Sequence, residues 1–232
     1  MKQRETSLNS PLNGHQHMED MGDEHIPGSF ETPLREDAFE MDDELKMELI
    51  EKHFREIMHV LGLDLSDDSL KGTPRRVAKM FVKEIFSGLN PKNKPEITLF
   101  ENKYRYNEML VEKDITFYSF CEHHFVPIWG KAHVAYISSG KVIGLSKLNR
   151  IVQYYARRPQ VQERMTVQIA NELKAVLDTE DVAVLIDAKH MCVAARGVQD
   201  TASSTVTAYY GGRFKNEATK QEFLRYLSPT GE

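Results

Sequence analysis

The chain has 232 residues, of which 41% are hydrophobic and 28% charged, proportions typical of a soluble globular protein with one sizeable domain. No run approaches the roughly 20 apolar residues that cross a bilayer, and no signal pattern opens the chain, so we expect a cytoplasmic protein without a membrane partner. Much of the net charge of −5 lies in residues 1–41, which hold nine acids and three bases. The nearly neutral remainder lacks the basic face that nucleic acid requires, which favours a small-molecule ligand.

Residues 1–41 are rich in Asn, Gly, Pro, Glu, Asp and His and have no hydrophobic periodicity. Such a composition buries too little apolar surface to offset the entropy lost on ordering, so we predict a disordered acidic tail. The remaining residues, 42–232, form one predicted domain. Within it we expect N-terminal helices over 42–90 and a core over 96–232.

Apolar residues at helical spacing predict a first helix over 43–61, which ends before Gly62. A second helix is predicted up to Gly88, with Thr73 as its N-cap and Pro74 at its first position. Runs rich in β-branched and aromatic residues predict strands at 97–100, 109–120, 128–138, 142–145, 181–188 and 204–210. The remaining helices are expected at 148–155, 161–177 and 215–227.

Residues 138–141 read as the turn of a hairpin between the third and fourth strands, so these strands should pair antiparallel. Helices first, then hairpins with a helical pair inserted between strands, indicate an α+β fold rather than a regular parallel alternation. Val182–Ile186 is apolar on both faces, which predicts that a partner subunit covers one of them.

The only two cysteines each lie beside histidines at the end of a predicted strand. Cys121 precedes His123 and His124, and Cys192 follows His190. Thiolate and imidazole are ligands that zinc prefers, and two cysteines with one histidine leave a fourth position for water, as in catalytic zinc sites. Spacing does not decide which of the adjacent histidines would join Cys121. Buried small hydrophobic residues are the alternative reading of both cysteines.

His190 and Cys192 are two residues apart, so an extended chain would point both to one face. A histidine beside the metal could exchange protons near neutral pH, although a merely hydrogen-bonded histidine at a strand end fits equally well. Gln162 and Glu163 fall in the first turn of a predicted helix. There the helix dipole favours an ionised carboxylate that could bind a purine or pterin edge, or merely stabilise the helix.

Ser146, Lys147 and Arg150 lie at the start of another predicted helix. A hydroxyl, cations and free amides at a helix start can bind phosphate, and Arg196 and Arg76 could add further positive charge. Solvated basic residues are the alternative interpretation of each taken separately.

Taken together, these motifs closely resemble those of the GTP cyclohydrolase I family. The matching segments are Thr73–Ala78, Gly144–Lys147 with Arg150, Gln162–Arg164, Cys121–His124, His190–Cys192 and Arg196–Val198. Only the tail to about Met41 lies outside the match. The resemblance implies a zinc-dependent hydrolase that converts GTP and water to 7,8-dihydroneopterin triphosphate and formate, the first step of pterin synthesis.

The resemblance also implies the role of each candidate residue. Cys121, His124 and Cys192 would bind zinc, and His123 and His190 would carry protons. Substrate would be held at two groups of residues. Glu163 helped by Gln162 would anchor guanine, and the triphosphate would meet Ser146, Lys147, Arg150, Arg196 and Arg76.

The fold implied is the tunnelling fold, in which sheets from several subunits join into a barrel, with active sites between subunits of a homodecamer. Two other readings remain: another tunnelling-fold enzyme such as 6-pyruvoyl tetrahydropterin synthase, which uses only histidines for zinc, and a non-catalytic zinc-stabilised assembly module. The sequence leaves open whether a feedback regulatory protein binds, and whether the product feeds folate or tetrahydrobiopterin.

Overall fold

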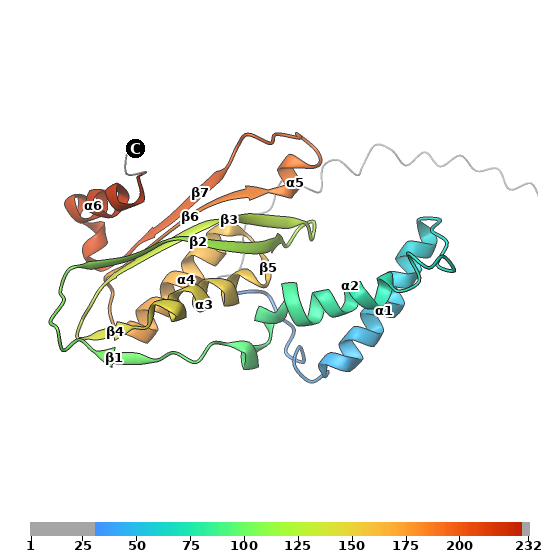
Figure 1. The fold of residues 1–232 in the computed structure, drawn as a ribbon, viewed down its shortest axis with the longest axis horizontal. Coiled ribbons are helices and arrows are strands. Elements are labelled where there is room, and N and C mark those ends of the chain that lie inside the picture. Colours follow the sequence, from blue (N-terminus) through green and yellow to red (C-terminus); the bar gives the residue numbers. More distant parts are fainter. Residues whose placement is uncertain (1–30, 229–232) are drawn as a thin grey trace, which may run out of the picture.

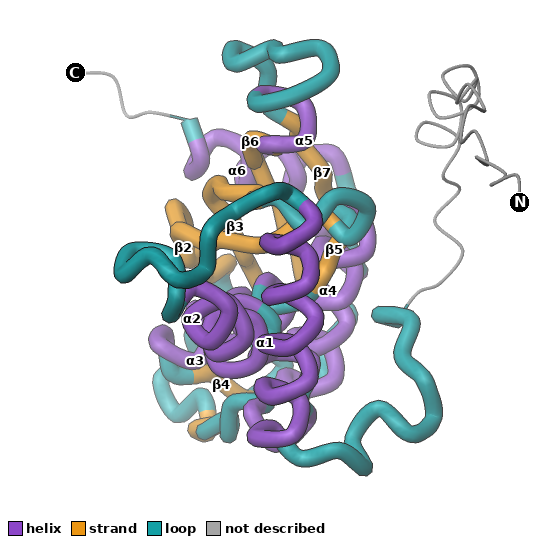
Figure 2. The backbone as a smooth tube through the Cα atoms, turned by 90° about the vertical axis from the view of Figure 1, so that its right-hand side faces the viewer, coloured by secondary structure: helices purple, strands orange, loops and turns teal. Residues whose placement is uncertain are grey.

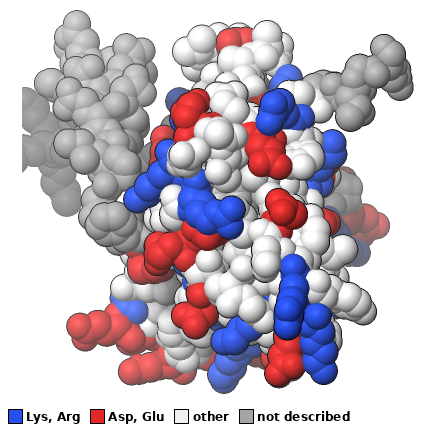
Figure 3. Space-filling view, turned by 90° about the vertical axis from the view of Figure 1, so that its left-hand side faces the viewer, with Lys and Arg blue, Asp and Glu red and all other residues white. Residues whose placement is uncertain are grey.

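The computed structural model describes residues 31–228. Most of the predicted tail, residues 1–30, therefore lies outside the described residues. A five-stranded sheet has two helices packed along one face, and a pair of helices lies beyond one end of the sheet (Figure 1). In the described part of the chain, no helix combines the length and apolar character needed to cross a membrane. On the face in Figure 3, acidic and basic side chains are interspersed.

The N-terminal helices form as the periodicity predicts. Helix α1 (Asp43–Val60) begins where the side chain of Asp42 accepts a hydrogen bond from the Leu45 amide. Helix α2 (Thr73–Lys79) packs beside it (Figure 2) and continues as a π-helical segment, η1 (Met80–Ile85). The predicted cap at Thr73 is wrong, because Gly72 is the N-cap. The Thr73 hydroxyl instead accepts from Arg76 at 2.8 Å.

The main sheet has the order β5-β2-β3-β6-β7. Strands β2 (Met109–Cys121), β3 (Pro127–Ile137), β6 (Val182–His190) and β7 (Thr205–Tyr210) pair antiparallel in that order. The two-residue strand β5 (Pro159–Gln160) runs parallel to β2. Short helical segments connect these elements: η2 (Ser87–Leu89), η3 (Pro91–Asn93), α5 (Met191–Ala194) and η4 (Gly212–Lys215).

The predicted hairpin at residues 138–141 does not form between the third and fourth strands. Strand β4 (Lys141–Ile143) pairs with β1 (Leu99–Glu101) in a separate two-stranded sheet. Both edges of β3 are already occupied, by β2 on one side and β6 on the other, so β4 has no place beside it. The turn itself is present, closed by the Ser138 hydroxyl, which donates to the Lys141 carbonyl at 2.7 Å.

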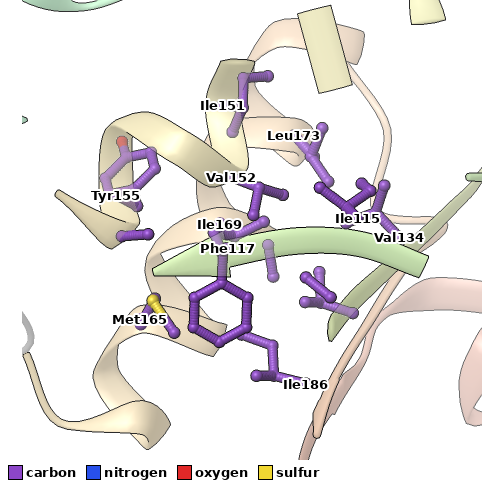
Figure 4. Packing of buried hydrophobic residues seen from close by; sticks show 14 of the residues in the cluster. Ile115, Phe117, Val134, Ile151, Val152, Tyr155, Met165, Ile169, Leu173 and Ile186 are labelled. Atoms are coloured by element: carbon purple, nitrogen blue, oxygen red, sulfur yellow. The ribbon is translucent and has the colours of Figure 1, made fainter. Parts of the chain in front are cut away.

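The hydrophobic core lies between the sheet and the inserted helical pair, α3 (Leu145–Ala156) and α4 (Gln162–Leu177). Apolar side chains of both helices converge on those of β2, β3 and β6 (Figure 4). Along β2 the inward positions alternate: Ile115, Phe117 and Cys121 are buried, whereas Tyr118 is exposed. This period of two, typical of a strand, directs the Cys121 side chain inward.

The opposite face of the sheet is covered in part by the C-terminal helix α6 (Glu217–Leu227). Phe214 and Phe223 are fully buried there against Ala183 and Ile137. The prediction that a partner subunit covers the second face of β6 is therefore wrong for this part of the strand, which the chain covers itself. Helices and a largely antiparallel sheet, with a helical pair inserted between its strands, confirm the α+β prediction for the single chain.

Candidate metal centre and active site

Two sulfurs and an imidazole meet at one end of the sheet. Cys121 is the last residue of β2, His124 lies in the turn that follows, and Cys192 is in the short helix α5 that follows β6. One donor atom from each residue lies within 4.8 Å of the others. The structure thus groups His124, rather than the adjacent His123, with both sulfurs. His123 is nevertheless close, since its Nδ1 lies 3.7 Å from Cys121 Sγ.

The register of the sheet brings these distant segments together. Strand β3 lies between β2 and β6, and its residue Ile128 pairs with Ser119 on one side and His190 on the other. The carboxyl ends of β2 and β6 therefore flank the same end of β3. Cys121 and Cys192 lie two residues beyond these pairing positions, on either side.

The turn that carries the histidines is held by its backbone and by aromatic packing. The amide of Phe125 donates to the Cys121 carbonyl at 2.8 Å, and the Cys121 amide donates to the Val126 carbonyl at 2.9 Å. Phe125 has a positive φ of 55° and its ring lies 5.2 Å from that of Phe86 and 6.4 Å from that of Phe81. The helical segment that contains Phe81 and Phe86 thus packs against the turn and stabilises it.

An ion pair between Arg164 and Glu122, for which the sequence predicted no role, lies next to this turn. Arg164, on the first turns of α4, binds both carboxylate oxygens of Glu122, which lies between the metal donor and the histidines. Their side chains are 4% and 21% exposed, respectively. The Glu122 amide also donates to the Gln160 carbonyl at 3.0 Å. Two features of the sequence could have indicated this ion pair. Glu122 stands between the predicted metal donors, and Arg164 directly follows Glu163, the predicted guanine anchor.

The chemistry of the donor set fits a divalent, borderline-soft cation. Burial raises the pKa of the Cys192 thiol, and the neighbouring Cys121 raises it further. Ionising the Cys192 thiol is thus unfavourable without a cation, and metal binding would release its proton. Two sulfurs with one imidazole are the ligands that zinc prefers, and three protein donors leave one tetrahedral position for another ligand.

His190 stands beside this centre and is held from α4. Its Nε2 lies 2.8 Å from Oε1 of Gln162, whose side chain is buried. Burial lowers the pKa of His190, and the carboxylate of Glu163 opposes that shift. Gln162 and Glu163 lie in the first turn of α4, as the sequence predicts, and Glu163 is exposed. Arg196 also reaches the centre, with Nη1 3.0 Å from Nε2 of His124.

The predicted phosphate-binding residues of α3 have contacts outside the metal centre. Asn149, beside Arg150, bonds the Glu112 carboxylate at 3.1 Å. Glu112 precedes Cys121 by nine residues on β2, and one turn further along α3 the Gln153 amide donates to the Thr116 carbonyl at 2.6 Å. The three residues are placed as follows: Ser146 is exposed, Lys147 donates to the Glu96 carbonyl at 2.6 Å, and Arg150 lines a cavity of about 450 Å³ with Lys83 and Arg157.

Arg76 is also engaged locally. On α2 it donates to the Ser69 carbonyl at 3.0 Å and to the Thr73 hydroxyl at 2.8 Å. The single chain therefore brings together the predicted metal donors, both histidines, Gln162, Glu163 and Arg196. The contacts described for Lys147 and Arg150 of α3 are with other residues.

Comparison with known proteins gives the same family that the site residues resemble. The family model for GTP cyclohydrolase I matches residues 50–228. A protein named GTP cyclohydrolase 1 from Flavobacterium johnsoniae is 61% identical over 216 residues, which cover 93% of this chain and 97% of the relative. One of the same name from Citrobacter koseri is 59% identical over 201 residues, covering 86% and 90%.

Among solved structures, the apo form of the archaeosine synthase QueF-Like shows only a remote likeness. It matches 45% of this chain and 93% of its own, with a TM-score of 0.38 and 17% identity. The match to the family model, in contrast, spans most of the described residues, including every donor of the candidate metal centre. The chain belongs to the GTP cyclohydrolase I family.

Proposed function

We propose that this site performs the reaction of its family, in which GTP and water give 7,8-dihydroneopterin triphosphate and formate, the first step of pterin biosynthesis. One observation carries the proposal: the Cys121, His124 and Cys192 donors lie beside His190 and Glu163 in a chain that matches the family over residues 50–228. A metal-binding group, a histidine and an exposed carboxylate are the parts that hydrolysis of a guanine ring requires.

Zinc is the cation that fits, and Cys121, His124 and Cys192 would hold it. When bound, zinc supplies Lewis acidity that lowers the pKa of water toward neutrality, which suits hydrolysis at C8 of guanine. The buried, inward-facing position of Cys121 at the end of a strand gives the group a rigid support.

Glu163 anchors the guanine in this proposal. Its carboxylate is exposed at the start of α4, at the positive end of the helix dipole. A carboxylate there can accept two hydrogen bonds from the N–H pair on one edge of guanine. The Glu163 carboxylate is near enough to His190 to oppose the lowering of its pKa by burial, so a guanine bound to Glu163 would lie close to that histidine.

His190 and His123 are the proposed proton carriers. When the bond between C8 and a ring nitrogen breaks, one of them donates a proton to the departing nitrogen. A second hydrolysis releases C8 as formate, and the ribose then rearranges to a ketone that condenses with the exposed nitrogen and releases one water. His190 is assigned to the first opening because it is held in place by Gln162 beside the metal donors.

The triphosphate would be bound by Ser146, Lys147 and Arg150 of a neighbouring subunit, with Arg196 and Arg76. Within one chain, the described contacts of the α3 residues Lys147 and Arg150 are with residues outside the metal centre. We therefore infer a homo-oligomer, and a homodecamer with barrel-forming sheets is the assembly proposed. In support, β7 is an edge strand among the described residues, and its Val206 is 58% exposed.

Mixing inactive subunits tests the shared site. Cys121→Ala lacks a metal donor and Arg150→Ala lacks a phosphate contact, so each homo-oligomer should be inactive. Dissociating and reassociating the two together should restore about a quarter or more of the activity, because some sites then combine intact halves. No recovery in mixed oligomers of verified composition would contradict a site shared between subunits.

The activity itself is tested by incubating zinc-loaded protein with GTP. Formate should appear together with a product that oxidises to fluorescent neopterin. A folded sample with full zinc occupancy that binds no GTP and releases no formate would contradict the enzyme and support a zinc-stabilised assembly module.

A further inference from the structure

The side-chain amide of Gln162 makes hydrogen bonds through both of its polar atoms, all to the protein. The two hydrogens of its nitrogen are shared among three acceptors, namely the Thr205 carbonyl at 2.8 Å, the Thr207 hydroxyl at 3.1 Å and the Ile186 carbonyl at 3.2 Å. Its oxygen lies 2.8 Å from His190 Nε2. With 1% exposure, the side chain has no free face toward a substrate.

The hydrogen-bond chemistry fixes the orientation of this amide. Backbone carbonyls only accept, so the NH₂ group of Gln162 must face Thr205 and Ile186, and the oxygen must face His190. A flipped amide would place its oxygen against two carbonyl oxygens. Because the Gln162 oxygen can only accept, Nε2 of His190 must carry a proton and donate it.

A threonine pair secures the same arrangement from the other side. The Thr166 hydroxyl donates to the backbone carbonyl of Gln162 at 2.8 Å, and it lies 2.7 Å from the Thr207 hydroxyl. Since the Thr166 proton is used, the Thr207 hydroxyl donates to Thr166. The lone pairs of Thr207 are then left to accept from the Gln162 amide. The directions of all these hydrogen bonds are mutually consistent.

We propose that Gln162 is a positioning residue for His190 and does not contact guanine. It holds the imidazole ring in one orientation and keeps the proton of the neutral ring on Nε2. Nδ1 is then the bare nitrogen of the neutral ring. This inference rests on the proposed function, and it replaces the sequence-based expectation that Gln162 helps Glu163 to bind guanine.

The test separates turnover from substrate affinity in the zinc-loaded enzyme. The variants are Gln162→Leu, which removes the acceptor to His190, and Glu163→Ala, which removes the guanine anchor. Turnover is measured as formate release. Affinity is measured with a GTP analogue that has carbon in place of N7, whose five-membered ring does not open by hydrolysis.

Gln162→Leu should lower kcat about a hundredfold, since partners that fix a histidine tautomer typically contribute about that much or more. Its Kd for the analogue should stay within about twofold of wild type. Glu163→Ala should instead mainly weaken binding, with a clearly higher Kd for the analogue. An unchanged kcat in Gln162→Leu, or a Kd weakened as much as in Glu163→Ala, would overturn the assignment.

A spectroscopic measurement reports the tautomer directly. In protein labelled with ¹⁵N-histidine, the His190 signals, identified by their loss in His190→Ala, should show a protonated Nε2 and a bare Nδ1 in wild type. In Gln162→Leu this preference should weaken. An unaltered tautomer in that variant would overturn the proposal. If wild type released no formate, the proposed function would be refuted, whereas this spectrum would still decide what Gln162 does.

Gln162→Leu also leaves two carbonyls without a donor, so a milder variant guards against a folding defect. Thr207→Val keeps a β-branched side chain on β7 and removes one acceptor from the Gln162 amide. It should lower kcat several-fold, on the order of 3–10, with unchanged analogue affinity. Two results together would count against the proposal. Thr207→Val would keep the kcat of wild type, and Gln162→Leu would lose activity only because it unfolds.

Discussion

Replacing Glu122 by Ala should both destabilise the fold and weaken metal binding. The change leaves the Arg164 guanidinium, whose side chain is 4% exposed, without the carboxylate that binds it bidentately. Removing one partner of a buried ion pair costs about 3–5 kcal/mol. Because Glu122 is itself 21% exposed, we expect the lower end, about 3 kcal/mol of the free energy of unfolding. Glu122→Gln keeps one acceptor and should cost about half as much.

The effect on the metal follows from position, since Glu122 lies between Cys121 and His123. A loosened turn should lower zinc affinity about 10–100-fold. Urea unfolding can be followed by the fluorescence of Trp129, the single tryptophan, near the start of β3. Glu112→Ala is the matched control, because it removes a carboxylate from β2 whose partner is the neutral Asn149. Equal unfolding free energies and equal zinc affinities in the two variants would refute this reasoning.

Three further predictions concern affinity, pH and metal. Glu163→Ala should weaken GTP binding at least about tenfold by loss of charged hydrogen bonds, whereas inorganic tripolyphosphate should bind unchanged by calorimetry. Burial lowers the pKa of His133 below its ordinary 6.5, and its Nδ1 accepts from the Asp114 amide. The unfolded chain therefore takes up that proton first, and stability present above pH 6.5 should be lost as pH falls below it. His133→Gln should flatten this dependence of Tm on pH; an unchanged slope would contradict it. Chelation should abolish formate release, and added zinc should restore it in wild type but not in Cys192→Ala.

Local sequence patterns predicted most of the elements, because hydrophobic periodicity and strand alternation act over a few residues. Helix α1 and strands β2 and β6 lie within a few residues of their predicted bounds. Thr73 was misread as a cap because a Thr followed by Pro can occupy either position. The pairing of β4 was misread because the occupied edges of β3 result from long-range contacts with β6.

In the site, too, local patterns predicted some features and long-range contacts determined the others. Cysteines beside histidines indicated metal ligands, but only the position of β3 between β2 and β6 explains how residues 71 apart meet. The hydrogen bond between Gln162 and His190 could not be predicted from local sequence, because the partners of Gln162 on β6 and β7 follow it by 24 to 45 residues. The surroundings of Arg150 were hidden for a related reason, since helix spacing does not reveal where along a strand a helix packs.

X-ray absorption at the zinc edge of the purified protein tests the proposed metal centre most directly. Ligation by Cys121, His124 and Cys192 predicts two sulfur neighbours at about 2.3 Å and two nitrogen or oxygen neighbours at about 2.0–2.2 Å, one from the imidazole and one from a non-protein ligand. A first shell without sulfur, or protein that binds no zinc when folded, would contradict it.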